Sequence, residues 1–110
     1  MKKMIKKIYN KCKKILFRCA DGIIEYKEAI ELYDNGNAII IDVKNEEEFA
    51  ENHIEGAINI PVYDIANKIG NIASNKNDTI ILYCKTGKRS KIAKDILEQE
   101  GYSNVYILYV

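Results

Sequence analysis

The chain has 110 residues, of which 47% are hydrophobic and 30% are charged, a composition and length that suit one compact domain and exclude disordered and collagen-like classes. The longest apolar run, Val105–Val110, is far shorter than the roughly 18 residues of a membrane-spanning helix, and no secretory signal is evident, so we expect a cytoplasmic protein. Three cysteines without Cys-x-x-Cys spacing argue against a disulfide framework and against a metal site of the zinc type.

The net charge of +1 conceals an uneven distribution of charge. Residues 1–20 hold eight basic and no acidic residues, which leaves nine basic and sixteen acidic ones for the other 90. On a helix, the apolar residues of 1–19 other than Phe17 fall within an arc of about 120°, and the basic ones lie outside it. We predict a basic amphipathic helix over residues 1–21 that packs on the domain behind it. Contact of residues 1–19 with a membrane surface or with a partner molecule is the alternative. No nucleic-acid partner is expected, because lysines alone give only nonspecific phosphate contacts.

From Ile23 onward, short apolar runs alternate with helical patterns. We predict strands at 23–24, 38–41, 57–60, 79–83 and 105–109, and helices at 25–33, 46–51, 63–73 and 88–99. Asn45 can cap the helix that begins at Glu46, and in the last helix we expect Ile92, Ala93, Ile96 and Leu97 to face inward. This alternation predicts an α/β fold with a mostly parallel sheet and helices on both faces.

The turn from Tyr83 to Ser90 has the features of a reactive thiol site. Cys84 lies at the carboxyl end of a predicted strand, where ligands bind in such sheets. Gly87 allows backbone N–H groups to converge, and the N-terminus of the next helix favours an anion. Five basic residues follow Cys84 within ten positions: Lys85, Lys88, Arg89, Lys91 and Lys94. We therefore predict a lowered pKa for the Cys84 thiol and an anionic substrate, the alternative being an inert cysteine that ends a buried strand.

This turn resembles the active-site loop of rhodanese-like domains, the single-domain sulfurtransferases. The resemblance covers about residues 23–108 and includes the segments 41–44, 48–49, 53–61 and 101–106. It implies a rhodanese-like three-layer fold with a five-stranded sheet over residues 22–110. It also implies that Cys84 accepts sulfane sulfur from a small anionic donor such as thiosulfate and passes it, as a persulfide, to cyanide, a thiol or a protein acceptor. No metal or organic cofactor is implied. The residues assigned to substrate binding are Lys85, Thr86, Gly87, Lys88, Arg89 and Ser90.

Two other functions remain open at this point. A non-enzymatic persulfide carrier or interaction module would need the same cysteine. A small phosphatase or arsenate reductase is the other, since phosphatases related to this fold also use a cysteine loop. That loop has five residues between the cysteine and the arginine, whereas four separate Cys84 from Arg89. The smaller loop is expected to suit a sulfur atom better than a phosphoryl group.

Several positions outside the turn also carry expectations. Asp42 and His53 are expected to have structural roles near the site, and the acidic run 46–48 to be a solvated helix start. Members of the resembled family usually have arginine at the position of Lys44, so a weaker contact is expected there. They usually have glycine at the position of Asn52, and asparagine tolerates the positive φ of such a turn. The usual closing C-terminal helix is absent from residues 22–110, and we expect residues 1–19 to cover the sheet face that it would cover.

Overall fold

The computed structural model describes residues 22–110, and the predicted basic helix over residues 1–21 lies outside them. Within residues 22–110, five strands form one sheet in the order β1-β5-β4-β2-β3, and every neighbouring pair is parallel. The sheet thus confirms the predicted α/β class and contains parallel pairs throughout. The strands are β1 (Ile23–Ile24), β2 (Ile39–Asp42), β3 (Ile58–Asn59), β4 (Thr79–Tyr83) and β5 (Asn104–Leu108).

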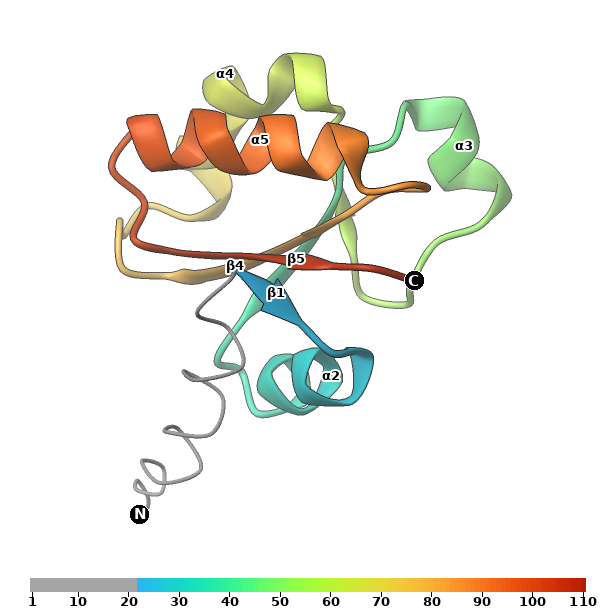
Figure 1. Ribbon diagram of the computed structural model, residues 1–110, viewed down its shortest axis with the longest axis horizontal. Helices are drawn as coiled ribbons and strands as arrows, with labels where there is room; N and C mark the ends of the chain where they lie inside the picture. The colour runs from blue at the N-terminus through green and yellow to red at the C-terminus, as the bar shows by residue number, and fades with distance from the viewer. Residues whose placement is uncertain (1–21) are drawn as a thin grey trace.

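Helices lie on both faces of this sheet, which makes the predicted three layers. Helices α4 (Ile65–Ile72) and α5 (Lys88–Gln99) cover one face, and α2 (Tyr26–Asp34) lies on the other (Figure 1). A 3₁₀ turn (Val62–Asp64) leads into α4, and the short α3 (Glu46–Glu51) stands at the end of the sheet where the turn between β4 and α5 also lies (Figure 1). None of the helices between residues 22 and 110 combines the length and apolar character needed to cross a membrane.

The central strands β2 and β4 are buried on both faces, as their continuous apolar runs predict. Successive side chains of a strand point to opposite faces of the sheet, so each strand contributes residues to two hydrophobic cores. Ile41 and Leu82 belong to the core under α4 and α5, while Ile40 and Ile81 belong to the core under α2. Burial on both faces holds β4 rigidly, and β4 is the strand that leads to Cys84.

One inward-facing residue was predicted wrongly on α5. Ile92 is 54% exposed, whereas the helix buries Ser90, Ala93 and Leu97. These three share a narrow stripe at spacings of three and four residues, and Ile92 lies about 100° of helical rotation from Ala93. The narrow stripe places Ser90, rather than Ile92, against the sheet.

The start of α3 is capped as predicted, but the turn after it differs from expectation. The Asn45 side chain accepts a hydrogen bond from the backbone N–H of Glu48 at 2.9 Å, and Glu48 Oε1 accepts one from the Asn45 N–H at 3.1 Å. Asn52 has a φ of −170°, so the positive φ considered for this position is not used. The positive φ falls instead on Gly56, at 92°, where an added Cβ would overlap the Tyr33 side chain.

Candidate active site

Cys84 directly follows β4, the middle strand of the sheet, and is 3% exposed. Three residues further on, Gly87 is the N-cap of α5 and has a φ of 92°, a left-handed conformation that glycine adopts without strain. This conformation directs the Gly87 N–H back toward the cysteine, and it donates a hydrogen bond to Cys84 Sγ at 3.1 Å. The short turn therefore folds its own backbone around the sulfur atom.

Opposing effects act on the pKa of the Cys84 thiol. Burial raises it, but hydrogen-bond donors around the sulfur outweigh burial and lower the pKa below its ordinary value. The donors are the Ser90 hydroxyl and the backbone N–H groups of Ser90, Gly87 and Arg89. All of them belong to the turn or to the first turn of α5, where a helix N-terminus favours negative charge. The geometry thus stabilises a thiolate in a site that is almost closed to solvent.

Ser90 places a buried hydroxyl group in the first turn of α5. It is fully buried, and within the described residues its hydroxyl has no well-aligned hydrogen-bond partner. A buried hydroxyl without an acceptor lowers the stability of the folded protein. Of the groups that lower the pKa of Cys84, the Ser90 hydroxyl has the largest effect. Ionised sulfur at Cys84 is the acceptor that would satisfy this hydroxyl. The first turn of α5 is therefore suited to a negatively charged sulfur and less well suited to a neutral thiol.

The side chain of Arg89 pairs with Glu48 of α3. Its guanidinium donates to Glu48 Oε1 at 2.7 Å and to Oε2 at 3.2 Å. The hydrogen bond from Arg89 is the main cause that lowers the pKa of Glu48 to about 2. The expectation of a solvated helix start holds for the exposed Glu46 and Glu47 but is wrong for Glu48, which is only partly exposed. Sequence reasoning missed this pair, and the Asn-x-x-Glu spacing of Asn45 and Glu48, typical of a capping box, is the signal that could have singled out Glu48.

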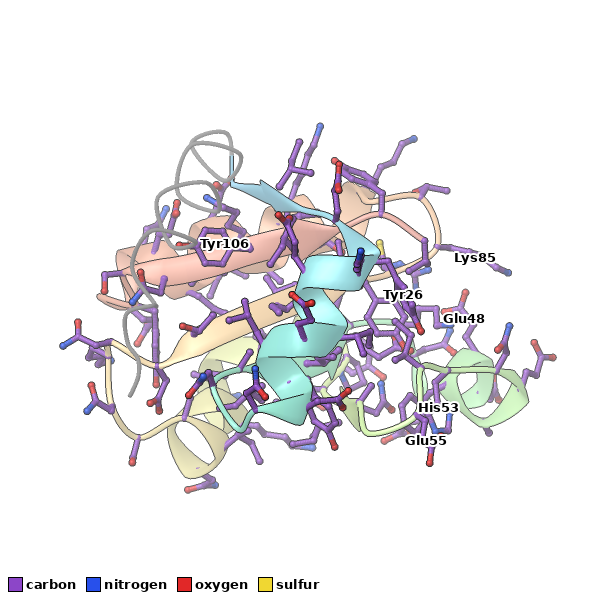
Figure 2. The ribbon with its side chains drawn as sticks, turned by 90° about the horizontal axis from the view of Figure 1, so that it is seen from below. Tyr26, Glu48, His53, Glu55, Lys85 and Tyr106 are labelled. Atoms are coloured by element: carbon purple, nitrogen blue, oxygen red, sulfur yellow. The ribbon has the colours of Figure 1, made fainter. Side chains whose placement is uncertain are left out.

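The remaining residues of the turn lie at its surface. Lys85, Thr86 and Lys88 are exposed, and Thr86 Oγ1 accepts a hydrogen bond from the Lys88 N–H at 3.5 Å. Figure 2 shows Lys85 extending away from the body of the molecule, on the same side as Glu48. The two lysines therefore place positive charge outside the buried sulfur, where it can attract an anion without neutralising the thiolate directly.

Asp42 supports the neighbouring turn, at the end of β2. It is fully buried; its Oδ1 accepts the Lys44 N–H at 2.8 Å, and its Oδ2 lies 3.5 Å from Lys44 Nζ. Next to it, the Tyr83 hydroxyl accepts the Ile54 N–H at 2.8 Å. Burial is the main cause that raises the pKa of Tyr83, and the nearby Asp42 carboxylate raises it further. Asp42 thus fixes the backbone at Lys44 and pairs with the charge of the Lys44 side chain.

His53 lies apart from the sulfur, on the α3 side of the site. Its Nδ1 donates to the Phe49 carbonyl at 2.7 Å, and its ring stacks on the Phe49 ring with centroids 3.7 Å apart. In Figure 2, Glu48 lies between His53 and Lys85. Both contacts bind His53 to α3. Within residues 22–110, no three histidine, cysteine, aspartate or glutamate side chains gather as metal ligands.

Comparison with known proteins accounts for this combination of sheet, turn and cysteine. Residues 25–109 match the Rhodanese-like domain family. The chain belongs to this family. It is 42% identical to the thiosulfate sulfurtransferase PspE of Escherichia coli strain K12 over 65 residues, which cover 59% of this chain and 62% of PspE. The chain spans less than two thirds of the length of the first curated relatives that it matches.

Solved structures of the family share the fold. The human single-domain sulfurtransferase TSTD1 superposes with a TM-score of 0.70 at 25% identity, over 79% of this chain and 88% of that one. A rhodanese with anions from Escherichia coli gives a TM-score of 0.60 at 36% identity, over 66% of this chain and 84% of that one. These matches confirm the rhodanese-like fold.

Proposed function

We propose that this protein is a sulfurtransferase in which Cys84 carries sulfane sulfur as a persulfide. The donor would be a small anion such as thiosulfate, and the acceptor cyanide, a small thiol or a protein thiol. The observation that carries the proposal is the Gly87 N–H that donates to Cys84 Sγ at 3.1 Å, at the N-terminus of α5. A relative named thiosulfate sulfurtransferase, 42% identical over 65 residues, supports the choice of donor.

The first half-reaction charges the cysteine. The Cys84 thiolate attacks the outer sulfur of thiosulfate, and a new S–S bond forms to Cys84 Sγ. The bond between the two sulfur atoms of thiosulfate breaks, and sulfite leaves with its electron pair. The negative charge then lies on the terminal sulfur of the persulfide. The Ser90 hydroxyl and the backbone N–H groups that lower the pKa of Cys84 are the donors available to hold it.

The second half-reaction returns the cysteine to its starting state. A nucleophile such as cyanide attacks the terminal sulfur, the persulfide S–S bond breaks, and the thiolate of Cys84 is restored. Sulfur is transferred without a net change in the oxidation state of the enzyme, which predicts ping-pong kinetics. A reducing compartment such as the cytoplasm would keep Cys84 available as a thiolate between turnovers.

The other residues of the turn would attract the donor or shape the site around the sulfur. Lys85 and Lys88 are exposed, and their positive charge would attract the anionic donor to the turn that surrounds Cys84. Arg89 would act through its backbone N–H, since its guanidinium is engaged by both oxygens of Glu48. Thr86 and Gly87 would shape the turn, and Gly87 would also supply the N–H that meets the sulfur.

Intact-mass measurement after treatment with thiosulfate tests the proposal. We expect a gain of one sulfur atom that cyanide removes and that Cys84→Ser abolishes. Cys12→Ser and Cys19→Ser are the matched controls, and both should retain the gain. Absence of the gain with thiosulfate and with a small-molecule persulfide would count against the proposal.

Steady-state turnover separates the enzyme from the other candidates. A persulfide carrier would gain sulfur but turn over thiosulfate and cyanide no faster than a free thiol. A phosphatase would release phosphate from an aryl phosphate in a reaction that needs Cys84. We expect thiocyanate formation that depends on Cys84 and no release of phosphate.

A further inference from the structure

Tyr109 lies at the carboxyl end of the sheet, the same end as Cys84. Strands β4 and β5 are parallel neighbours, and Leu82 pairs with Ile107 at the end of their register. Cys84 and Tyr109 each follow two residues after this pair, just beyond the ends of β4 and β5, so the chain leaves the sheet at the same edge in both cases. The pairing of β4 with β5 therefore places an aromatic residue at the same end of the sheet as the reactive sulfur.

The two side chains also face the same layer of the molecule. Leu82, Cys84 and Val105 all belong to the core under α4 and α5. Tyr109 reaches the same layer, because its ring contacts Gly87 at the N-terminus of α5. Helix α5 begins in this layer, directly above the cysteine, with Gly87 as its N-cap.

The Tyr109 ring rests on Gly87. A Cβ added to Gly87 would overlap Cε1 of that ring and lie 3.1 Å from both Cδ1 and Cζ. The contact is made by the carbon edge of the ring, and Tyr109 is otherwise 45% exposed. An aromatic ring that close leaves Gly87 little freedom, although a glycine by itself has access to many backbone conformations.

We propose that Tyr109 is a positioning residue for the sulfur-binding turn, whose ring holds the Gly87 backbone so that its N–H meets Cys84 Sγ. The proposal rests on the proposed function, in which Cys84 is the reactive sulfur. The Gly87 N–H is one of the donors that lower the pKa of Cys84, so a looser Gly87 weakens the stabilisation of the thiolate. Because ring carbons make the contact, phenylalanine serves as well as tyrosine.

The pH dependence of Cys84 alkylation measures this effect directly. Alkylation of the full chain by iodoacetamide is followed by mass spectrometry on the peptide that contains Cys84. In Tyr109→Val, which removes the ring but introduces a β-branched residue that suits extended backbone, we expect the midpoint of the profile to rise by about half a pH unit or more. Tyr109→Phe should restore the wild-type midpoint. The charged groups around the turn, Lys85, Lys88, Arg89 and Glu48, are the same in every variant.

A second tyrosine at this end of the sheet supplies the control. Tyr63 is 69% exposed and lines a groove with Asn45, Glu46 and Glu47. Tyr63→Val should leave the alkylation midpoint where it is. The proposal is overturned if Tyr109→Val also leaves it unchanged, if Tyr109→Phe shifts it as far as valine does, or if Tyr109→Val loses its cooperative thermal transition, which would indicate a purely structural role. Failure of the proposed function appears separately, as a wild-type protein that gains no sulfur from any sulfane donor.

Discussion

Arg89 and Glu48 form a two-fold hydrogen-bonded ion pair, with the guanidinium donating at 2.7 Å and 3.2 Å to the two carboxylate oxygens. The pair joins the first turn of α5, which supplies donors to the sulfur, to the first turn of α3. Glu48 Oε1 also accepts the Asn45 N–H, so the carboxylate is fixed from both sides. The turn around Cys84 is thereby anchored to an element 41 residues earlier in the chain.

Acid should weaken the fold through this pair. The pKa of Glu48 is about 2 in the folded protein and ordinarily 4.5, so the unfolded chain binds the proton more readily. The stabilisation is therefore complete above pH 4.5 and is lost as the pH falls toward 2. In Glu48→Gln the urea midpoint should be lower than in wild type at neutral pH and should fall less steeply across this acid range. An identical acid slope in both proteins would contradict the role given to Glu48. Glu47→Gln, an exposed neighbour, is the control.

Ser90→Ala should separate activity from stability. The Ser90 hydroxyl has no well-aligned partner among the described residues and is buried, so its removal should leave the free energy of unfolding unchanged or slightly higher. The same hydroxyl lowers the pKa of Cys84, so the pH profile of Cys84 alkylation should move to higher pH and sulfur transfer at neutral pH should slow. Ser103→Ala removes an exposed hydroxyl just before β5 and should change neither the alkylation profile of Cys84 nor the rate of sulfur transfer. A Ser90→Ala protein that is less stable but has an unchanged Cys84 alkylation profile would contradict this prediction.

Much of the fold could be predicted because its signals are local. The strand Thr79–Tyr83 and the helix Lys88–Gln99 have the predicted bounds, since a continuous apolar run and a glycine just before a helix mark them within a few residues. The position of Cys84 at the carboxyl end of β4 follows from the same pattern. The fold and the location of the turn were therefore accessible from sequence.

The contacts that complete the site were not accessible in the same way. The pairing of Arg89 with Glu48 depends on how α3 and α5 meet in space, and periodicity carries no such information. The contact of Tyr109 with Gly87 depends on the register of β4 and β5. The exposure of Ile92 shows the same limit, because a helical pattern gives the spacing of a buried stripe but not its width. The roles of the individual turn residues in binding a donor remain predictions.

Replacement of Asp42 should lower the free energy of unfolding but have little effect on the rate of sulfur transfer. Asp42→Ala would leave Lys44, which is 8% exposed, without its carboxylate partner and would remove the acceptor of the Lys44 N–H. We expect a loss of about 3 kcal/mol in the free energy of unfolding, measured by urea titration. Asp64→Ala breaks the more exposed pair with Lys68 and should cost less than about 1 kcal/mol. Folded Asp42→Ala should keep sulfur transfer within a few fold of wild type, and a much larger loss would indicate a direct role in catalysis.

The predicted packing of residues 1–19 on the domain has a clear consequence for stability. Among the described residues 22–110, the nine-residue helix α2 lies on one face of the sheet, whereas α4 and α5 share the other (Figure 1). If the apolar side of residues 1–19 packs on the domain, deletion of residues 1–20 exposes that surface, and we expect a loss of at least about 3 kcal/mol in thermal or urea unfolding.

Substitutions within residues 1–19 separate this packing from binding to a membrane. Ile5→Ser with Ile8→Ser removes apolar surface and should lower the melting temperature nearly as far as the deletion does. Lys3→Glu with Lys7→Glu changes the basic side alone and should leave the melting temperature unchanged. An unchanged melting temperature in the deletion, together with loss of binding to anionic vesicles, would instead indicate that residues 1–19 contact a membrane surface.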